Sequence, residues 1–254
     1  MQSALSSTDK VAKPTSTAPA NAAEVAPAAV IPRWKRTFDI LLIMAASPLL
    51  VVVGGIIAVL IKSVSRGAVF FRQERIGFLG QPFTCLKFRT MRVNAVTAVH
   101  QGYLKTLMES DLPMTKMDLL GDSRLIPFGS ILRSTGLDEL PQLVNVLRGE
   151  MSLVGPRPCL PYEYAGYLPW QKQRFNSLPG LTGLWQVSGK NKTTFNEMIK
   201  MDIVYAEKRC LLLDVAILLK TVPTLIVQVL EMLTRRRSST KASPSSDNPS
   251  GCRG

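Results

Sequence analysis

The residues best suited to chemistry form an acidic pair, Asp138-Glu139, inside the stretch Leu137–Leu143. One carboxylate can act as a nucleophile, and a neighbouring one can bind a divalent cation. A structural explanation also exists, because Asp138 lies where a helix should begin and Thr135 lies three residues before it, as in a capping box. Taken alone, the pair leaves both explanations open.

Positively charged residues accompany this pair along the chain. Arg133 lies five residues before Asp138, and Arg157 stands between Pro156 and Pro158. The two prolines limit the backbone around Arg157 and would pre-set its guanidinium group for bidentate binding of a phosphate. A rigid surface turn explains the same three residues, so this motif too has two interpretations.

Two further segments carry cations that could meet an anion. Lys87 and Arg89 are two residues apart in an expected strand and so share a face, which suits either solvent or an anionic ligand. The loop 179–191 is rich in glycine and hydroxyl groups, and it could place backbone amides and Lys190 near a phosphate or sugar. Together, two acids and several cations indicate chemistry on a phosphorylated substrate.

One apolar segment, Ile40–Ile61, runs for 22 residues without a charge and has Lys and Arg on both sides. About twenty apolar residues suffice for a helix to cross a membrane. Ser47-Pro48 interrupts the segment, since proline removes a backbone hydrogen bond and the serine hydroxyl can bind the freed carbonyl. Two interpretations follow: a spanning helix with a proline kink, or a helix–break–helix that dips into one leaflet and returns.

The overall charge of +13 favours an anionic partner, such as lipid head groups, nucleic acid or a phosphorylated substrate. The apolar segment favours anionic membrane lipids, and no nucleic-acid-binding motif is present, so we expect no nucleic acid partner. The four cysteines form no C-x-x-C pair, which disfavours a zinc site. The single histidine, His100, has no nucleophile motif with it and is expected in a loop.

We predict an α+β, mainly helical fold. It consists of a disordered tail (1–30), a re-entrant membrane hairpin (31–66), a cytoplasmic catalytic domain (67–234) and a disordered basic tail (235–254). The expected elements are strands at 68–72 and 83–91 joined in a short β-hairpin, a helix over 140–147 ended by Gly149, a helix over 193–208, and an interfacial or core helix over 211–233, broken near Pro223. Residues 92–121 are expected to be a mobile helical insertion or an irregular one.

The chain resembles the bacterial sugar transferase family, the small monotopic polyprenyl-phosphate phosphoglycosyl transferases. The resemblance covers roughly residues 33–230. The motifs that carry it are Lys35-Arg36-x-Phe38-Asp39, Ser47-Pro48, Arg75-Ile76-Gly77, Lys87–Met91, Leu137–Leu143, Met151–Pro158, Pro179–Val187 and Asp202-x-x-Tyr205.

This resemblance implies an enzyme that moves a sugar-1-phosphate from a UDP-sugar to undecaprenyl phosphate and releases UMP, as the first step of exopolysaccharide or glycoconjugate synthesis. It implies that Asp138 is the nucleophile of a covalent phosphosugar intermediate and that Glu139 binds Mg²⁺. Arg133 would hold the lipid phosphate, and Arg157 would face the nucleotide. Lys87 and Arg89 would add positive field.

The resemblance also makes Ser47-Pro48 a re-entrant break, which keeps both ends of the chain on the cytoplasmic face of the bacterial inner membrane and allows a homodimer. Gly136 and Lys190 depart from residues common in the family. The sequence of the segment 184–189 resembles that of family members that act on UDP-glucose or UDP-galactose, so the resemblance favours one of these as donor. A non-catalytic basic membrane adaptor would explain the charge and the anchor but not Asp138-Glu139, and an inactive homologue is a further alternative.

Overall fold

A computed structural model describes residues 30–92, 124–189 and 193–241, and in them the fold is mainly helical, as predicted, with two small two-stranded sheets. The longer elements are α1 (Arg33–Val64), β1 (Phe70–Ile76), β2 (Pro82–Phe88), α3 (Gly129–Thr135), α4 (Gln142–Arg148), β3 (Ser152–Val154), α5 (Pro161–Ala165), β4 (Gly180–Thr182), α6 (Leu184–Val187), α7 (Phe195–Lys208) and α8 (Leu211–Lys241). Short 3-10 helices are η1 (Phe78–Gly80), η3 (Leu137–Glu139) and η4 (Gln171–Asn176). The predictions for His100, Lys190, most of the insertion and most of both tails lie outside the described residues.

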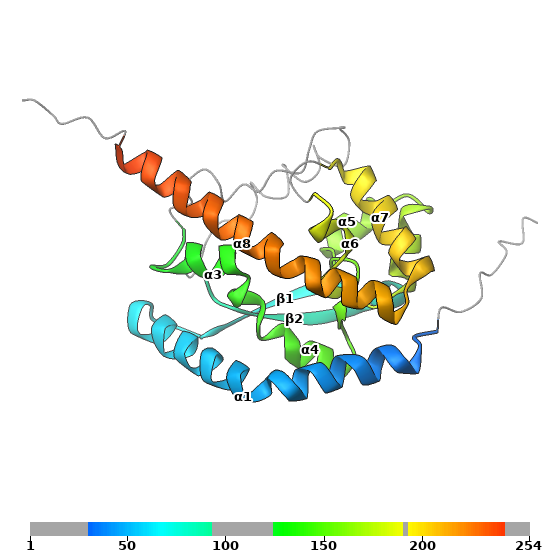
Figure 1. The fold of residues 1–254 in the computed structure, drawn as a ribbon, viewed down its shortest axis with the longest axis horizontal. Coiled ribbons are helices and arrows are strands. Elements are labelled where there is room, and N and C mark those ends of the chain that lie inside the picture. Colours follow the sequence, from blue (N-terminus) through cyan, green and yellow to red (C-terminus); the bar gives the residue numbers. More distant parts are fainter. Residues whose placement is uncertain (1–29, 93–123, 190–192, 242–254) are drawn as a thin grey trace, which may run out of the picture.

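The apolar segment forms one continuous helix, α1, with Pro48 inside it. The helix changes direction near its middle (Figure 1). Pro48 has no N–H for the carbonyl of Met44, and the hydroxyl of Ser47 donates to that carbonyl at 2.8 Å. The predicted interruption is therefore corrected to a bend in a continuous helix, and the expected role of the serine is confirmed.

Both halves of α1 pack on the rest of the protein. The first half buries Lys35, Asp39 and Ile43, and the second half buries Ile57 and Ile61. Apolar side chains on its other side are exposed, among them Leu49, Val51, Val52 and Val59. The helix thus has one face for the protein and one for an apolar surrounding.

Helix α8 corrects two predictions. It continues through Pro223, where a break was expected, and it extends to Lys241, beyond the predicted start of the C-terminal tail at residue 235. By length and hydropathy, both Arg33–Val64 and Leu211–Glu231 could cross a membrane. Asp214 lies inside the second of these apolar stretches, and its side chain is completely buried in an ion pair.

That ion pair joins the first turns of α1 and α8. The ammonium group of Lys35 donates to Asp214 at 2.6 Å, to the hydroxyl of Tyr205 at 2.9 Å and to the carbonyl of Val154 at 2.9 Å. From this junction the two helices diverge across the molecule (Figure 1). The side chain of Lys35 is fully buried, so its charge does not face a lipid surface.

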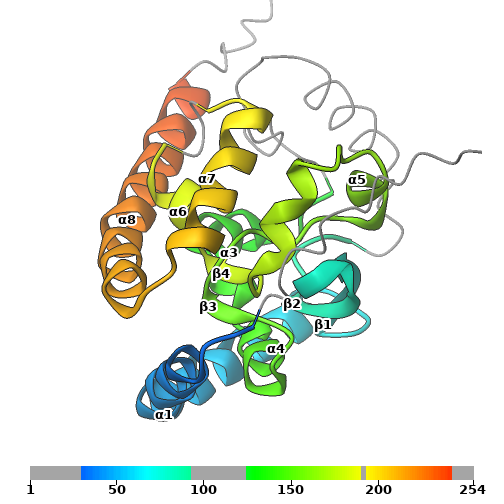
Figure 2. The same cartoon turned by 90° about the vertical axis from the view of Figure 1, so that its right-hand side faces the viewer.

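The predicted hairpin is confirmed with shifted bounds. β1 and β2 pair antiparallel from Phe70 opposite Phe88 to Ile76 opposite Pro82. Figure 2 shows this hairpin beside α1, with α4 close by.

The second sheet was not predicted. β3 and β4 pair in parallel, with Ser152 opposite Gly180 and Val154 opposite Thr182. The backbones approach so closely that a Cβ added to Gly155 would lie 2.2 Å from the carbonyl oxygen of Leu178. The Gly155 and Gly180 motifs, which read as loops in the sequence, therefore hold each other in place.

Candidate active site

The acidic pair lies in η3, between α3 and α4. Gly136 has φ 72°, a left-handed conformation that glycine adopts without strain, and it turns the chain from α3 into η3. Asp138 is 8% exposed. The helix-cap explanation is wrong, because α4 begins after Pro141 without a side-chain cap, and the Thr135 hydroxyl donates to the carbonyls of Ile131 and Leu132.

Lys87 reaches this pair from β2. Its ammonium nitrogen lies 2.6 Å from Oε1 of Glu139, although 52 residues separate the two in sequence. Both side chains are partly exposed, at 20% and 36%, so the pair adds little to stability. The consequence of this ion pair is placement, because it brings a cation from β2 to Glu139, the residue that follows the buried Asp138.

Arg133 lies in the helix that leads into the acidic pair, whereas Arg89 binds the chain directly after α1. Arg133 is half-buried in the last turn of α3, the helix that leads into the acidic pair. Arg89 is buried and donates to the carbonyls of Ser65 and Arg66 at 3.0 and 2.9 Å, directly after α1. The structure therefore gives Arg89 a structural partner and separates it from its neighbour Lys87.

Arg157 is exposed between buried Pro156 and Pro158, just after β3. Two buried arginines bind backbone carbonyl groups of this turn. Arg174 donates to the carbonyl of Arg157 at 2.8 Å, and Arg75 donates to the carbonyl of Pro158 at 3.0 Å. The pKa of Arg75 is lowered by burial and, to a smaller extent, by the charge of Arg157.

Arg174 is in turn paired with Asp202 of α7, at 2.5 Å, and both are almost fully buried. Burial raises the pKa of Asp202 to about 6, and the charge of Arg174 opposes this rise. The Asp202-x-x-Tyr205 motif is thus structural here: Asp202 supports the Pro-Arg-Pro turn, and Tyr205 binds Lys35. Sequence reasoning named this motif only for the resemblance and did not assign these roles.

The thiol of Cys85 is buried on β2. Its pKa is raised mainly by burial, and charged neighbours also act on it. Those neighbours are Lys87, Arg75, Glu139 and Arg157. The Pro-Arg-Pro turn and the acidic pair both contact the hairpin, the turn through Arg75 of β1 and the pair through Lys87 of β2.

The two carboxylates of the acidic pair could bind Mg²⁺ only together with oxygen atoms of a bound substrate. Within the described ranges, no group of three or more His, Cys, Asp or Glu side chains could hold a metal ion. Mg²⁺ commonly binds one or two carboxylates plus substrate phosphates, and Asp138 and Glu139 supply that number. Glu139 is the more exposed of the two, and one of its oxygens is also bound to Lys87.

Comparison with known proteins places this geometry in context. Residues 31–228 match the model of the family described as bacterial sugar transferase. The chain is 40% identical over 193 residues to the exopolysaccharide production protein ExoY of Sinorhizobium fredii, which covers 74% of this chain and 84% of that protein.

Two relatives have names that state a reaction. The undecaprenyl-phosphate galactose phosphotransferase of Salmonella typhimurium is 39% identical over 74% of this chain and 39% of its own length. The UDP-glucose:undecaprenyl-phosphate glucose-1-phosphate transferase of Caulobacter vibrioides is 39% identical over 76% of this chain and 69% of its own length.

Proposed function

The chain belongs to the bacterial sugar transferase family, and from this membership we propose that it transfers a sugar-1-phosphate from a UDP-sugar to undecaprenyl phosphate. The names of the Salmonella and Caulobacter relatives support this reaction and favour galactose or glucose as the sugar. The ExoY name supports a role at the start of exopolysaccharide synthesis. The observation that carries the proposal is the contact of Lys87 with Glu139, which places a cation from β2 beside the residue that follows Asp138.

In the first step, a carboxylate oxygen of Asp138 attacks the β-phosphorus of the UDP-sugar. A bond forms between that oxygen and phosphorus, the bond from phosphorus to the bridging oxygen breaks, and UMP leaves with that oxygen. Lys87 and the exposed Arg157 would stabilise the charge on the diphosphate. When bound at Glu139, Mg²⁺ would neutralise further charge on the diphosphate.

In the second step, an oxygen of the lipid phosphate attacks the same phosphorus. The bond between Asp138 and phosphorus breaks, which restores the carboxylate and yields a lipid diphosphate sugar. Arg133, in the turn of α3 before the acidic pair, would hold the lipid phosphate.

We further propose that α1 is re-entrant at the cytoplasmic face of the inner membrane. Its support is the packing of both halves of α1, because Lys35 and Asp39 near one end and Ile57 and Ile61 near the other are buried against the same body of protein. A helix that crossed the ~30 Å hydrocarbon core would carry one end away from that body. Cytosolic UDP-sugar and lipid phosphate would then both reach Asp138.

The test is UMP release by purified protein in detergent, with undecaprenyl phosphate, Mg²⁺ and a panel of UDP-sugars. We expect release with UDP-galactose or UDP-glucose, and none from Asp138→Asn, because an amide is not a nucleophile. UMP release by the folded Asp138→Asn variant would refute the assignment of the nucleophile. No release from wild type with any donor would favour the adaptor or the inactive homologue.

A further inference from the structure

An apolar groove adjoins the acidic pair. It has a volume of about 290 Å³ and lies between the second half of α1 and α3. Its walls are entirely apolar; they include Val53, Ile56 and Leu60 of α1, Ile131 and Leu132 of α3, and Leu137. The groove shares its elements with the charged site, because Leu132 of α3 lines it and precedes Arg133, and Leu137 of η3 lines it and precedes Asp138.

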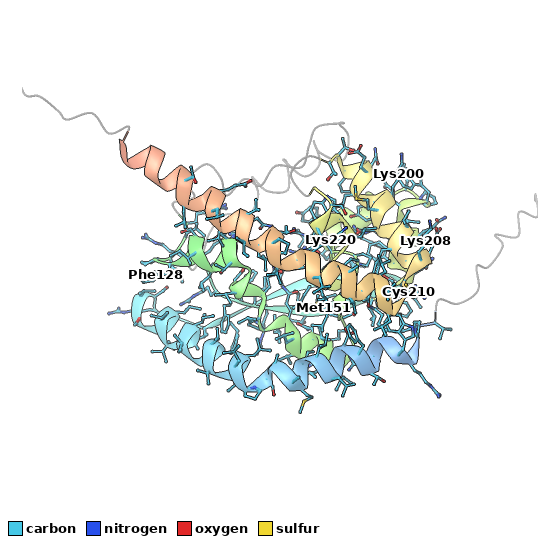
Figure 3. The ribbon with its side chains drawn as sticks, in the orientation of Figure 1. Phe128, Met151, Lys200, Lys208, Cys210 and Lys220 are labelled. Carbon is cyan, nitrogen blue, oxygen red and sulfur yellow. The ribbon has the colours of Figure 1, made fainter. Side chains whose placement is uncertain are left out.

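Phe128 stands at the rim of this groove in an unusual conformation. It has φ 67°, a left-handed backbone that is strained for a phenylalanine, and its side chain is 53% exposed. Figure 3 shows it at the end of the molecule where the second half of α1 faces α3. Strain of this kind concentrates at ligand sites. Here it places an aromatic ring at the mouth of an apolar channel.

We propose that this groove binds the first isoprene units of the polyprenyl phosphate acceptor, an assignment that rests on the proposed function. An amphiphile with an anionic head and an apolar tail needs a charged site joined to an apolar wall. Helix α3 supplies both, because its Ile131 and Leu132 line the groove and its last turn carries Arg133. The UDP-sugar has no comparable apolar part.

The position and size of the groove define how much lipid it holds. Its α1 wall belongs to a helix apolar enough to enter a membrane, so the groove opens towards the hydrocarbon layer. Its volume lies at the lower end of the roughly 300–1,000 Å³ typical of small-molecule sites. Only the part of the tail nearest the phosphate fits, and the remainder extends into the bilayer.

The experiment fills the groove and measures lipid binding. Ile56→Trp places a large ring inside it, and Val51→Trp is the matched control, since Val51 is 73% exposed on the opposite side of the same helix and does not line the groove. Both variants and wild type are placed in nanodiscs of phosphatidylethanolamine and phosphatidylglycerol. Binding of a fluorescent undecaprenyl phosphate is measured without donor.

We expect Ile56→Trp to bind the probe at least about tenfold more weakly. The tryptophan ring would prevent the lipid from burying about two of its carbons in the groove, and that loss of burial accounts for the factor. Val51→Trp should match wild type, and the KM for UDP-sugar should be unchanged in both. A change of less than about twofold in Ile56→Trp would overturn the proposal. Equal displacement of the probe by excess phosphatidylglycerol would show a general acyl-chain site and would also overturn it.

A second variant guards against misfolding of the first. Phe128→Gly relieves the backbone strain and removes the ring, so its thermal midpoint should not fall while its lipid binding weakens. Unchanged lipid binding by Phe128→Gly would show that the Phe128 ring takes no part in the site. Because binding is measured without donor, a wild-type protein that binds lipid but releases no UMP would refute the proposed reaction and leave the groove assignment standing.

Discussion

One oxygen of Glu139 is shared between two possible partners, and this defines a test of its metal role. Lys87 lies 2.6 Å from that oxygen, so a cation at Glu139 must share the carboxylate or displace the ammonium group. We expect Glu139→Gln to raise the Mg²⁺ concentration for half-maximal activity by about tenfold or more, since the loss of one charged ligand costs at least about 1.4 kcal/mol. Titration of UMP release against Mg²⁺ measures this.

Lys87→Met serves as the matched variant, because it removes the competitor and keeps the chain length. It should lower the half-maximal Mg²⁺ concentration while it raises the KM for UDP-sugar. Identical Mg²⁺ curves for wild type, Glu139→Gln and Lys87→Met would count against a metal at Glu139.

Asp202 supports the exposed Arg157 through Arg174. Its contribution to stability can be separated from its contribution to activity. Asp202→Asn leaves the charge of Arg174 buried without its partner, which should lower the free energy of unfolding by about 3–5 kcal/mol. The double variant Arg174→Met/Asp202→Leu should recover much of that stability, because it buries no charge. Its activity should stay low, since the hydrogen bond from Arg174 to the Arg157 carbonyl is gone.

Thermal unfolding and steady-state kinetics on the same samples check this pair of variants. Full activity in the stable double variant would show that the turn needs no support from Arg174. Restored stability with a raised KM for UDP-sugar would confirm that Arg174 positions Arg157.

Among the elements, the bend of α1 has a testable cause. Pro48→Ala restores an N–H that can donate to the Met44 carbonyl, so the helix should straighten. A straight α1 cannot bury Asp39 and Ile57 against the protein at the same time, and both stability and activity should fall. The thermal midpoint should drop by about 2–4 °C for each kcal/mol lost.

Ser47→Ala is the control for this element. It removes only the hydrogen bond to Met44, which contributes about 1 kcal/mol, and leaves the bend in place. A Pro48→Ala variant with full activity and a higher midpoint would show that the bend has no role.

How far the sequence predicts these elements depends on how local their causes are. The β1–β2 hairpin was predicted because its turn glycines, Gly77 and Gly80, lie between two adjacent strand patterns. The β3–β4 pair was missed because each strand has three residues and the contact of Gly155 with Gly180 joins distant segments.

The same distinction holds at the site. Asp138, Glu139 and Lys87 could be named from motifs, and the structure brings Lys87 to Glu139, the neighbour of Asp138 in sequence. The buried partners Arg174 and Lys35 could not be assigned, because a charged residue in the sequence looks like a surface residue until its partner is known. Asp214 gave the one available signal, since an acid inside an apolar helix calls for a buried cation.

For the whole molecule, the packing of α1 and α8 predicts where the chain ends lie. Both helices start at the Lys35–Asp214 junction, and both halves of α1 contact the same body of protein. Reporter tags fused at either end should therefore both be found in the cytoplasm of intact cells. An N-terminal tag detected from the periplasm would establish a spanning helix in place of a re-entrant one.

The Lys35–Asp214 contact also has a consequence for the order in which the chain is made. Its two partners are 179 residues apart, and ribosomes add about 5–20 residues per second. For roughly ten to forty seconds, the nascent chain therefore holds α1 at the membrane with the ammonium group of Lys35 lacking its buried carboxylate. Only when α8 emerges can this charge be enclosed, so the first helix to reach the bilayer is among the last to be locked, and chains that stop before Asp214 should be cleared by proteolysis.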